Sequence, residues 1–196
     1  MRQGLPCKDV NAREPPSSAR EGRARGFRDT AGVIAPPPLL ALAALVIGLA
    51  LDWLLPVRVL SGLLSFPIRI IIAAILVALG AVLGLSALIA FFKAHTHVEP
   101  WKPTSALVTG GIFRHLRNPM YVGLCLLLIG AAVLLASVWT LATTLLFALV
   151  LHAGVVRREE RYLAGKFGEA YRDYCARVPR YGWSRIGPPR STRPMR

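Results

Sequence analysis

The chain has 196 residues, of which 54% are hydrophobic, and its mean hydropathy is +0.49. So apolar a composition excludes an ordinary soluble domain of this length, and we expect a polytopic membrane protein. The formal charge is +14, and the basic residues gather near the ends, with seven Lys and Arg in residues 1–32 and eleven in residues 157–196. Basic ends beside apolar spans are typical of the cytosolic side of a membrane protein and of contact with anionic lipid. No basic face is interleaved with stacking aromatics, so we expect no nucleic acid among the partners.

Residues 1–32 are rich in Arg, Pro, Ser and Gly and poor in large apolar side chains. Such a segment buries too little surface to offset the entropy of ordering, which predicts a disordered basic tail. The apolar run that begins at Val33 is long enough to anchor the chain, and a secretory signal is not expected. We therefore expect one membrane domain over residues 33–187 and a second disordered basic tail over residues 188–196.

Four apolar segments predict four membrane-spanning helices, at residues 39–55, 70–92, 120–136 and 138–153. The last two share one uncharged run, residues 120–153, which as a single helix would rise about 51 Å, well beyond a hydrocarbon core of about 30 Å. This run should fold back at Ala136 and Ser137, just before Trp139. In the second span, Gly80 and Gly84 would let another helix or a ligand approach closely. Four spans place both termini and the loop at residues 93–118 on the cytosolic side.

Residues 155–178 predict an amphipathic cytosolic helix after the hairpin. Its apolar positions recur at four-, four- and three-residue steps, at Leu163, Phe167, Tyr171 and Tyr174. This stripe would lie against the membrane or cover a site as a lid. The expected fold class is an all-α integral membrane protein with four transmembrane helices, including a C-terminal helical hairpin, followed by this helix.

The segment just before the third span suits an anion-binding site. Asn118 is a favoured N-cap and Pro119 suits the first helical position, so a helix should begin here with its N–H groups facing the cytosol. Beside Arg114, His115 and Arg117, these N–H groups would attract a carboxylate. The same residues also suit a plain membrane boundary, and their spacing alone does not separate the two interpretations.

Glu159 and Glu160 are adjacent acids at the other end of the hairpin. They would suit a cationic group or a sugar diol, but they also suit local ion pairs. The arginines available for such pairs are Arg157, Arg158 and Arg161. If the hairpin brings the two ends together, a zwitterionic ligand with an amino-acid head and a positive centre would satisfy both.

These residues form a recognisable combination of motifs: LVTGGIFR at 107–114, RNPMYVG at 117–123, EE at 159–160 and FG-x-x-Y-x-x-Y at 167–174. Over roughly residues 80–183 the chain resembles the isoprenylcysteine carboxyl methyltransferase family, above all its bacterial members and their phospholipid N-methyltransferase relatives. The resemblance implies an integral membrane methyltransferase of the bacterial inner membrane with a cytosolic active site. It implies S-adenosylmethionine as cofactor, S-adenosylhomocysteine as product, and a lipophilic acceptor that is either an isoprenylcysteine-type carboxylate, as in a prenylated protein, or a lipid amine. The cofactor-binding positions that it implies are Gly84, His115, Arg117, Asn118, Pro119, Tyr121, Glu159 and Glu160.

Methyl transfer is an in-line displacement that needs no covalent nucleophile, so positioning and the exclusion of water should contribute most. For the catalytic step we predict that Arg158 or Arg161 holds a substrate carboxylate, or that Glu159 accepts the proton of an amine acceptor. We expect no metal, although His95, His97 and Glu99 lie close together in sequence, because they lack a clear complete ligand set.

Two alternatives stay open. Membrane sterol and enone reductases have a similar architecture and use NADPH, whose phosphate would suit Arg114 and Arg117 but not the two glutamates. A small non-enzymatic scaffold with lipid-binding basic tails would also fit the composition.

Overall fold

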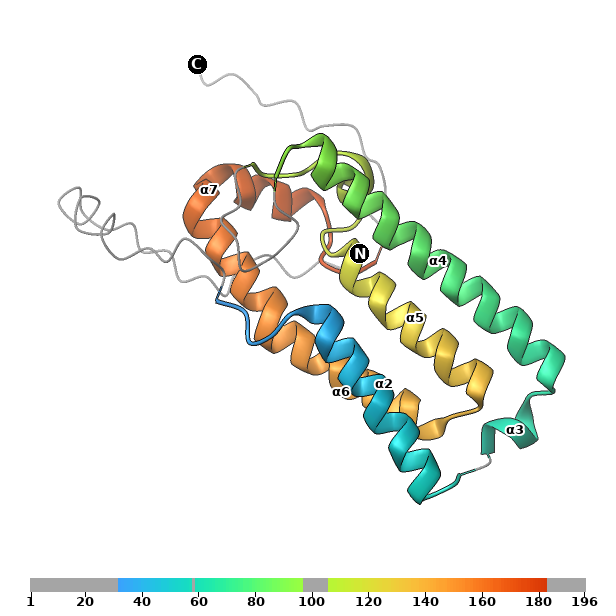
Figure 1. The fold of residues 1–196 in the computed structure, drawn as a ribbon. Helices are drawn as coiled ribbons and strands as arrows, with labels where there is room; N and C mark the ends of the chain where they lie inside the picture. The colour runs from blue at the N-terminus through green and yellow to red at the C-terminus, as the bar shows by residue number, and fades with distance from the viewer. Residues whose placement is uncertain (1–31, 58, 97–105, 183–196) are drawn as a thin grey trace, which may run out of the picture.

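The computed structural model of the protein describes residues 32–57, 59–96 and 106–182, and these ranges contain helices and no strands. The helices are α2 (Pro37–Leu54), α3 (Val59–Leu63), α4 (Phe66–Lys93), η1 (Gly111–Arg114), α5 (Pro119–Leu135), α6 (Val138–Leu151), η2 (His152–Val156) and α7 (Arg157–Arg177) (Figure 1). The predicted all-helical class is confirmed. Most of the predicted tails, residues 1–31 and 188–196, lies outside the described residues.

Three helices in the described part of the chain are long and apolar enough to cross a membrane: α2, α4 and the continuous helix that begins with α6. Helix α5 is apolar as well but has only 17 residues. Their positions agree with the four predicted segments, although α4 begins four residues before the predicted span. The link between the first two spans contains the short helix α3, which the sequence analysis did not predict.

The long helices pair through small residues. Helix α4 lies along α5 and α2 along α6, and α5 also contacts α6 (Figure 1). A Cβ added to Gly80 would stand 2.8 Å from the Gly123 carbonyl oxygen, and one added to Gly123 would stand 2.8 Å from the Gly80 carbonyl oxygen. At the α2–α6 contact, a Cβ on Gly48 would come within 2.7 Å of Thr140. The predicted close approach of a helix at Gly80 is therefore confirmed.

The hairpin bends where the sequence predicts. Ala136 ends α5 in the left-handed conformation, with φ of 54°, and Ser137 caps α6 by accepting a hydrogen bond from the Thr140 N–H. The indole N–H of Trp139 donates to the Leu55 carbonyl at 2.8 Å, which ties this end of the hairpin to the end of α2. The bend returns the chain to the end of the bundle from which α5 started.

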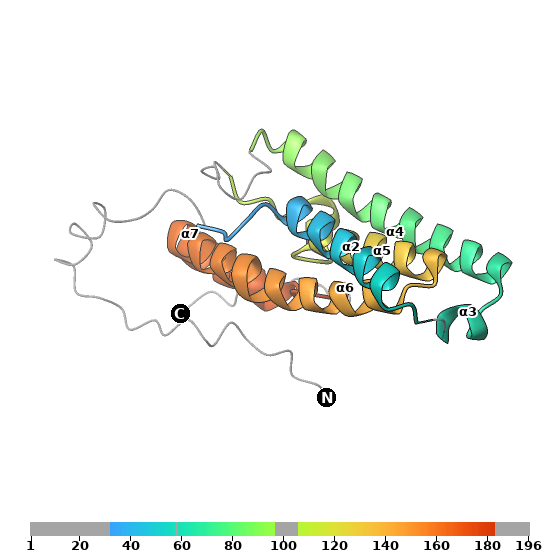
Figure 2. The same cartoon turned by 60° about the horizontal axis from the view of Figure 1, so that its bottom comes forward.

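The segment predicted as the fourth span and the helix that follows it form one continuous element. Helix α6 passes through the π-helix η2 into α7, and Figure 2 shows α7 continuing from α6 on the opposite side of the bundle from α4. In η2, Gly154 faces Ile34 so closely that an added Cβ would stand 2.4 Å from the Ile34 side chain. A π-turn rotates the following helix relative to the preceding one, and nothing in the hydropathy pattern indicated it.

Helix α7 is bent at Gly168, whose φ of 54° and ψ of −123° interrupt the helical backbone. Beyond this bend, the red end of the ribbon runs back toward the start of α5 (Figure 1). The predicted apolar stripe packs inside the protein at this end: Tyr171 and Tyr174 are buried with Ala87 of α4 and Phe113 of η1. This packing fixes the polar segments on either side of the hairpin against each other.

Candidate functional site

The loop before α5 is held in place by aromatic packing. Phe113 is buried, its ring meets that of Phe91 edge to face at 5.2 Å, and its carbonyl accepts a hydrogen bond from the Tyr174 hydroxyl at 2.7 Å. Burial raises the pKa of Tyr174 well above its ordinary value, so its hydroxyl stays protonated and able to donate. These contacts anchor the loop that carries His115, Arg117 and Asn118 to α4 and α7.

Helix α5 begins at Pro119 with Asn118 as N-cap residue, as predicted, but the Asn118 side chain makes no capping hydrogen bond. Its amide nitrogen donates instead to the Arg180 carbonyl at 3.2 Å. Because Asn is a common N-cap, the sequence predicts a local capping role for this side chain; in the structure it holds a segment far along the chain.

The two ends of the hairpin meet in an ion pair. The guanidinium of Arg117 donates to Glu160 at 3.0 Å and to the Cys175 sulfur at 2.8 Å, and the side chains of Arg117 and Glu160 are only 8% and 12% exposed. The predicted convergence of residues 114–121 with residues 157–162 is therefore confirmed. The alternative that Glu160 pairs with its neighbours in α7 is wrong, because the fold turns its carboxylate toward α5.

A second arginine, which the sequence analysis missed, completes this cluster. Arg180 donates from Nε to one oxygen of Glu160 at 2.8 Å and from Nη2 to the other at 2.5 Å. It follows the end of α7, inside the predicted membrane domain of residues 33–187, and no motif in the sequence marks it as a site residue. The position of Arg180 depends on the burial of Val178, two residues before it, and the sequence alone carries no signal for this contact.

Glu159 points to a different partner. It accepts a hydrogen bond from the Tyr121 hydroxyl at 2.6 Å. Of the two adjacent glutamates, Glu159 therefore contacts α5 itself and Glu160 contacts the loop before α5. Burial raises the pKa of Glu159 to about 7; the hydrogen bond from Tyr121 lowers it and the nearby charge of Glu160 raises it. Near neutral pH this carboxyl can therefore hold or release a proton.

The other predicted residues lie around this cluster or apart from it. Pro119 is fully buried and His115 is half-buried at the end of η1. Gly84 lies on α4 beside Gly123, and a Cβ added to it would meet nothing within 4 Å. Arg158 and Arg161 are exposed; Arg158 donates to the Gly32 carbonyl at 2.7 Å and Arg161 to the Arg157 carbonyl at 3.3 Å. The structure does not bring these two arginines to Glu160.

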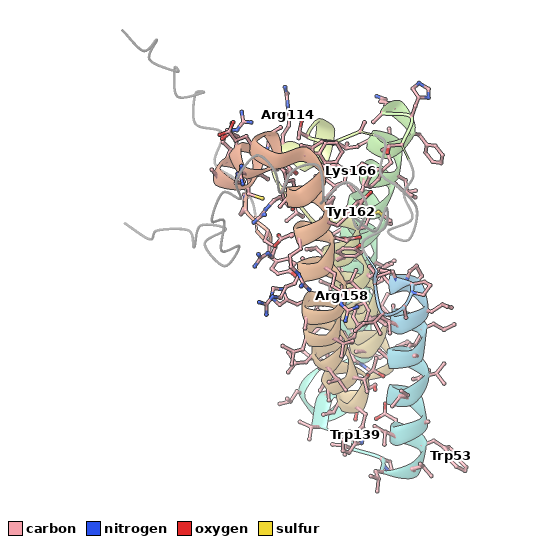
Figure 3. The ribbon with its side chains drawn as sticks, turned by 90° about the vertical axis from the view of Figure 1, so that its left-hand side faces the viewer. Trp53, Arg114, Trp139, Arg158, Tyr162 and Lys166 are labelled. Carbon is pink, nitrogen blue, oxygen red and sulfur yellow. The ribbon has the colours of Figure 1, made fainter. Side chains whose placement is uncertain are left out.

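Figure 3 shows where six labelled charged and aromatic residues lie along the bundle. Arg114, Lys166, Tyr162 and Arg158 lie along the part that α7 lines, and Trp53 and Trp139 lie near the opposite end. Among the described residues no group of three His, Cys, Asp or Glu side chains is placed to hold a metal ion, and His97 and Glu99 lie outside those residues.

Comparison with known proteins adds to this geometry. The sequence model of the family described as phospholipid methyltransferase matches residues 68–170, which is more than half of the chain and includes Arg117, Tyr121 and both glutamates. The chain belongs to the phospholipid methyltransferase family. Its resemblance to isoprenylcysteine methyltransferases is confirmed as well, by relatives that carry that name.

A protein-S-isoprenylcysteine O-methyltransferase of Schizosaccharomyces pombe is 36% identical over 106 residues, which are 52% of this chain and 44% of that protein. Protein-S-isoprenylcysteine O-methyltransferase B of Arabidopsis thaliana is 30% identical over 109 residues, 53% of this chain and 54% of that protein. The matched part of this member of the family thus spans about half the length of these curated relatives. No solved structure matches the chain.

Proposed function

We propose that the protein is an integral membrane methyltransferase that uses S-adenosylmethionine to methylate a lipophilic acceptor. The observation that carries this proposal is the paired cluster at the start of α5, in which Arg117 contacts Glu160 and Tyr121 contacts Glu159. It lies within the region that matches the phospholipid methyltransferase family. The yeast and plant relatives described above are both named as methyltransferases of isoprenylcysteine.

The residues present fit such a cofactor. S-Adenosylmethionine supplies a methyl group on a positively charged sulfur and carries an amino-acid head with both signs of charge. The cluster offers both signs as well, because Arg117 and Arg180 surround Glu160 while Glu159 lies beside Tyr121. Gly84 leaves open space on the neighbouring helix, into which any larger side chain would project. We propose His115, Arg117, Asn118, Pro119, Tyr121, Glu159, Glu160 and Gly84 as the residues that hold the cofactor.

The protein's own contribution would be orientation and the exclusion of water, as expected for a displacement without a covalent intermediate. Arg117 and Glu160 are nearly inaccessible to solvent, so their charges act in a medium that screens them weakly. Glu159 is suited to accept a proton near neutral pH, which an amine acceptor would require and a carboxylate acceptor would not. Arg158 and Arg161 stay candidates for holding a substrate carboxylate, from the exposed side of α7.

For the acceptor we propose an isoprenylcysteine-type carboxylate first, because both relatives are named for that class of substrate. The long helices present large apolar side chains to their surroundings, among them Ile71, Ile75 and Leu145, so a prenyl or acyl chain could reach the site from the bilayer. A lipid amine is the second candidate, favoured by the pKa of Glu159 and by the family description.

We further propose that α5 is a fourth span and that the site faces the cytosol. At 17 residues α5 would rise about 26 Å, which is short for a span but is supported by α4 along its length. The polar end of the bundle carries Lys93, Arg114 and most of the charges of α7, whereas the far end carries few basic residues. The excess of positive charge favours the cytosolic side. From the motif resemblance to bacterial members of the family, we propose the inner membrane of a bacterium as the location.

Binding of S-adenosylhomocysteine to the purified protein in lipid nanodiscs tests the cofactor. We expect Arg117→Ala and Glu160→Ala each to weaken binding about tenfold or more, because each removes a partner from a buried charged pair. The matched controls are Arg172→Ala and Glu169→Ala on the exposed face of α7, which should bind as the wild type does. Calorimetry that detects no binding in several lipids would overturn the proposal.

A second experiment identifies the acceptor. Incubation with methyl-labelled S-adenosylmethionine should transfer label to a farnesylated cysteine derivative, and transfer to phosphatidylethanolamine vesicles instead would show the amine acceptor. NADPH provides the comparison for a reductase: the acidic pair beside Arg117 disfavours its phosphate, so it should not displace S-adenosylhomocysteine. A scaffold, by contrast, would tolerate neutralisation of Arg117 and Glu160 without loss of its role.

A further inference from the structure

The segment that follows α7 crosses the candidate site and contacts the loop before α5, the Glu160 carboxylate and the π-helix η2. We call residues 178–181 the C-terminal strap. Its first residue, Val178, is buried in the same cluster as Phe113 and Tyr174. Because the chain is anchored there, the next three residues lie across the start of α5 and do not extend outward into solvent.

Backbone contacts fasten the strap to the loop before α5. The Arg117 N–H donates to the Pro179 carbonyl at 3.1 Å, and the Asn118 side chain donates to the Arg180 carbonyl at 3.2 Å. These two bonds hold consecutive residues of the strap against consecutive residues of the loop. The position of the Arg180 backbone is therefore fixed by the residues that precede Pro119.

The far end of the strap is fastened to the π-helix. The Tyr181 hydroxyl lies 2.9 Å from Nδ1 of His152, the first residue of η2. The strap thus spans from the start of α5 to the junction of α6 and α7. Arg180 lies between these fixed points.

From this position Arg180 contacts both oxygens of Glu160, and Arg117 donates to one of them. A guanidinium that donates two hydrogen bonds to a carboxylate fixes the plane of that carboxylate as well as its place. With Arg180 alone removed, Glu160 would keep its charge and its contact with Arg117 but could rotate about its terminal bond.

We propose that Arg180 is a positioning residue of the cofactor site, which orients the Glu160 carboxylate for its ligand and is itself held by the C-terminal strap. This inference rests on the proposed function, because it assumes that Glu160 binds the cofactor. It assigns a role to a residue outside both motif regions, and it predicts that Arg180 acts only through Glu160.

A double-mutant cycle tests this dependence in the full-length protein in lipid nanodiscs, with S-adenosylhomocysteine as the probe. Arg180→Ala should weaken binding about tenfold, the size expected for a lost hydrogen bond between charged groups. In a Glu160→Gln background the same substitution should change affinity less than about twofold. Arg180→Lys should recover only part of the affinity, because lysine cannot fix the plane of the carboxylate.

Kinetics and a control separate positioning from a merely structural role. With methyl-labelled S-adenosylmethionine, Arg180→Ala should raise the KM for the cofactor about tenfold and leave kcat within about twofold. Arg177→Ala, an exposed arginine whose Nε donates to the Asp173 carbonyl of its own helix, should leave both unchanged.

Three results would overturn the inference. If Arg180→Ala binds as the wild type does, the proposed function stands and Arg180 has no part in it. If the loss is equal in the wild-type and Glu160→Gln backgrounds, or follows a fall in unfolding temperature that Arg180→Lys does not restore, the strap is only structural. If the wild-type protein does not bind the probe, the proposed function falls and this inference falls with it.

Discussion

Glu160 and Glu159 are neighbours in sequence, but the structure gives them opposite electrostatic surroundings. Glu160 lies between two arginines, which compensate its charge although it is almost fully buried. Glu159 has a neutral hydroxyl as partner, and burial raises its pKa to about 7. The charge of Glu160 is therefore compensated by its neighbours, whereas Glu159 is able to change its charge near neutral pH.

The pKa of Glu159 predicts a pH-dependent stability. Because the pKa is raised above the usual value, the protonated acid stabilises the folded protein fully below about pH 4.5, and this contribution is lost as the pH rises through about 7. We expect the unfolding temperature in detergent, measured without ligand, to fall between pH 5 and pH 8. Glu159→Gln, which cannot ionise, should remove that part of the decrease.

Tyr121→Phe provides the control for this assignment. The hydrogen bond from Tyr121 lowers the pKa of Glu159, so its removal should move the decrease in stability to higher pH. A profile that is the same for wild type, Glu159→Gln and Tyr121→Phe would show that another group is responsible.

At the scale of helices, the contact between α4 and α5 depends on the absence of two side chains. A Cβ added to either Gly80 or Gly123 would stand 2.8 Å from the carbonyl oxygen of the other, which is too close. Gly123→Ala should therefore force the helices apart and cost about 1–3 kcal/mol, the usual range for overpacking. The measurement is thermal or denaturant unfolding in a defined lipid–detergent mixture.

Gly84→Ala, on the facing helix α4, is the matched control, because its added methyl group meets nothing within 4 Å. It should unfold as the wild type does while binding S-adenosylhomocysteine more weakly, if the open space beside Gly84 belongs to the cofactor. Equal unfolding of all three proteins would contradict the packing argument, and unchanged binding by Gly84→Ala would remove Gly84 from the site.

The helices show which features were predictable from sequence. Runs of apolar residues set the spans, Ala136 and Ser137 set the bend, and Asn118 with Pro119 set the start of α5, because each is a local property of the chain. The π-helix η2 was not predictable, because the hydropathy pattern does not distinguish a π-turn from an α-helical turn; in the fold its Gly154 lies close against Ile34. Nor was the use of the Asn118 side chain, whose partner lies 62 residues away.

For the whole molecule, convergence of the two hairpin ends was predictable because a bilayer permits few ways to place one long uncharged run. Arg180 was not, because its contact depends on the bend at Gly168 and on burial of Val178 after it. The motif resemblance identified the residues of the loop and of α7, and it gave no information about the strap.

The arrangement of the bundle predicts a labelling pattern. Arg114 and Lys166 lie toward the charged end, and Trp53 lies near the opposite end and is 84% exposed (Figure 3). In a background without native cysteines, Arg114→Cys and Lys166→Cys should react with an impermeant maleimide only after cells are permeabilised. Trp53→Cys should react in intact cells.

Two other outcomes of this labelling experiment would lead to different conclusions. If all three positions reverse sides, the proposed orientation is wrong and the shared site stands. If Arg114→Cys and Lys166→Cys label from opposite sides, the two ends of the hairpin cannot form one site, which would contradict the fold itself.

The contact between Arg180 and Glu160 also sets an order for biogenesis. Translation reaches residue 180 only after every described helix has been made, so a nascent chain can insert its spans before its binding groups are fully assembled. Under the proposed function, a ribosome-bound intermediate would hold the methyl donor poorly. Competence would come late, once residue 180 has been added, and so a chain stalled before that point would consume little donor.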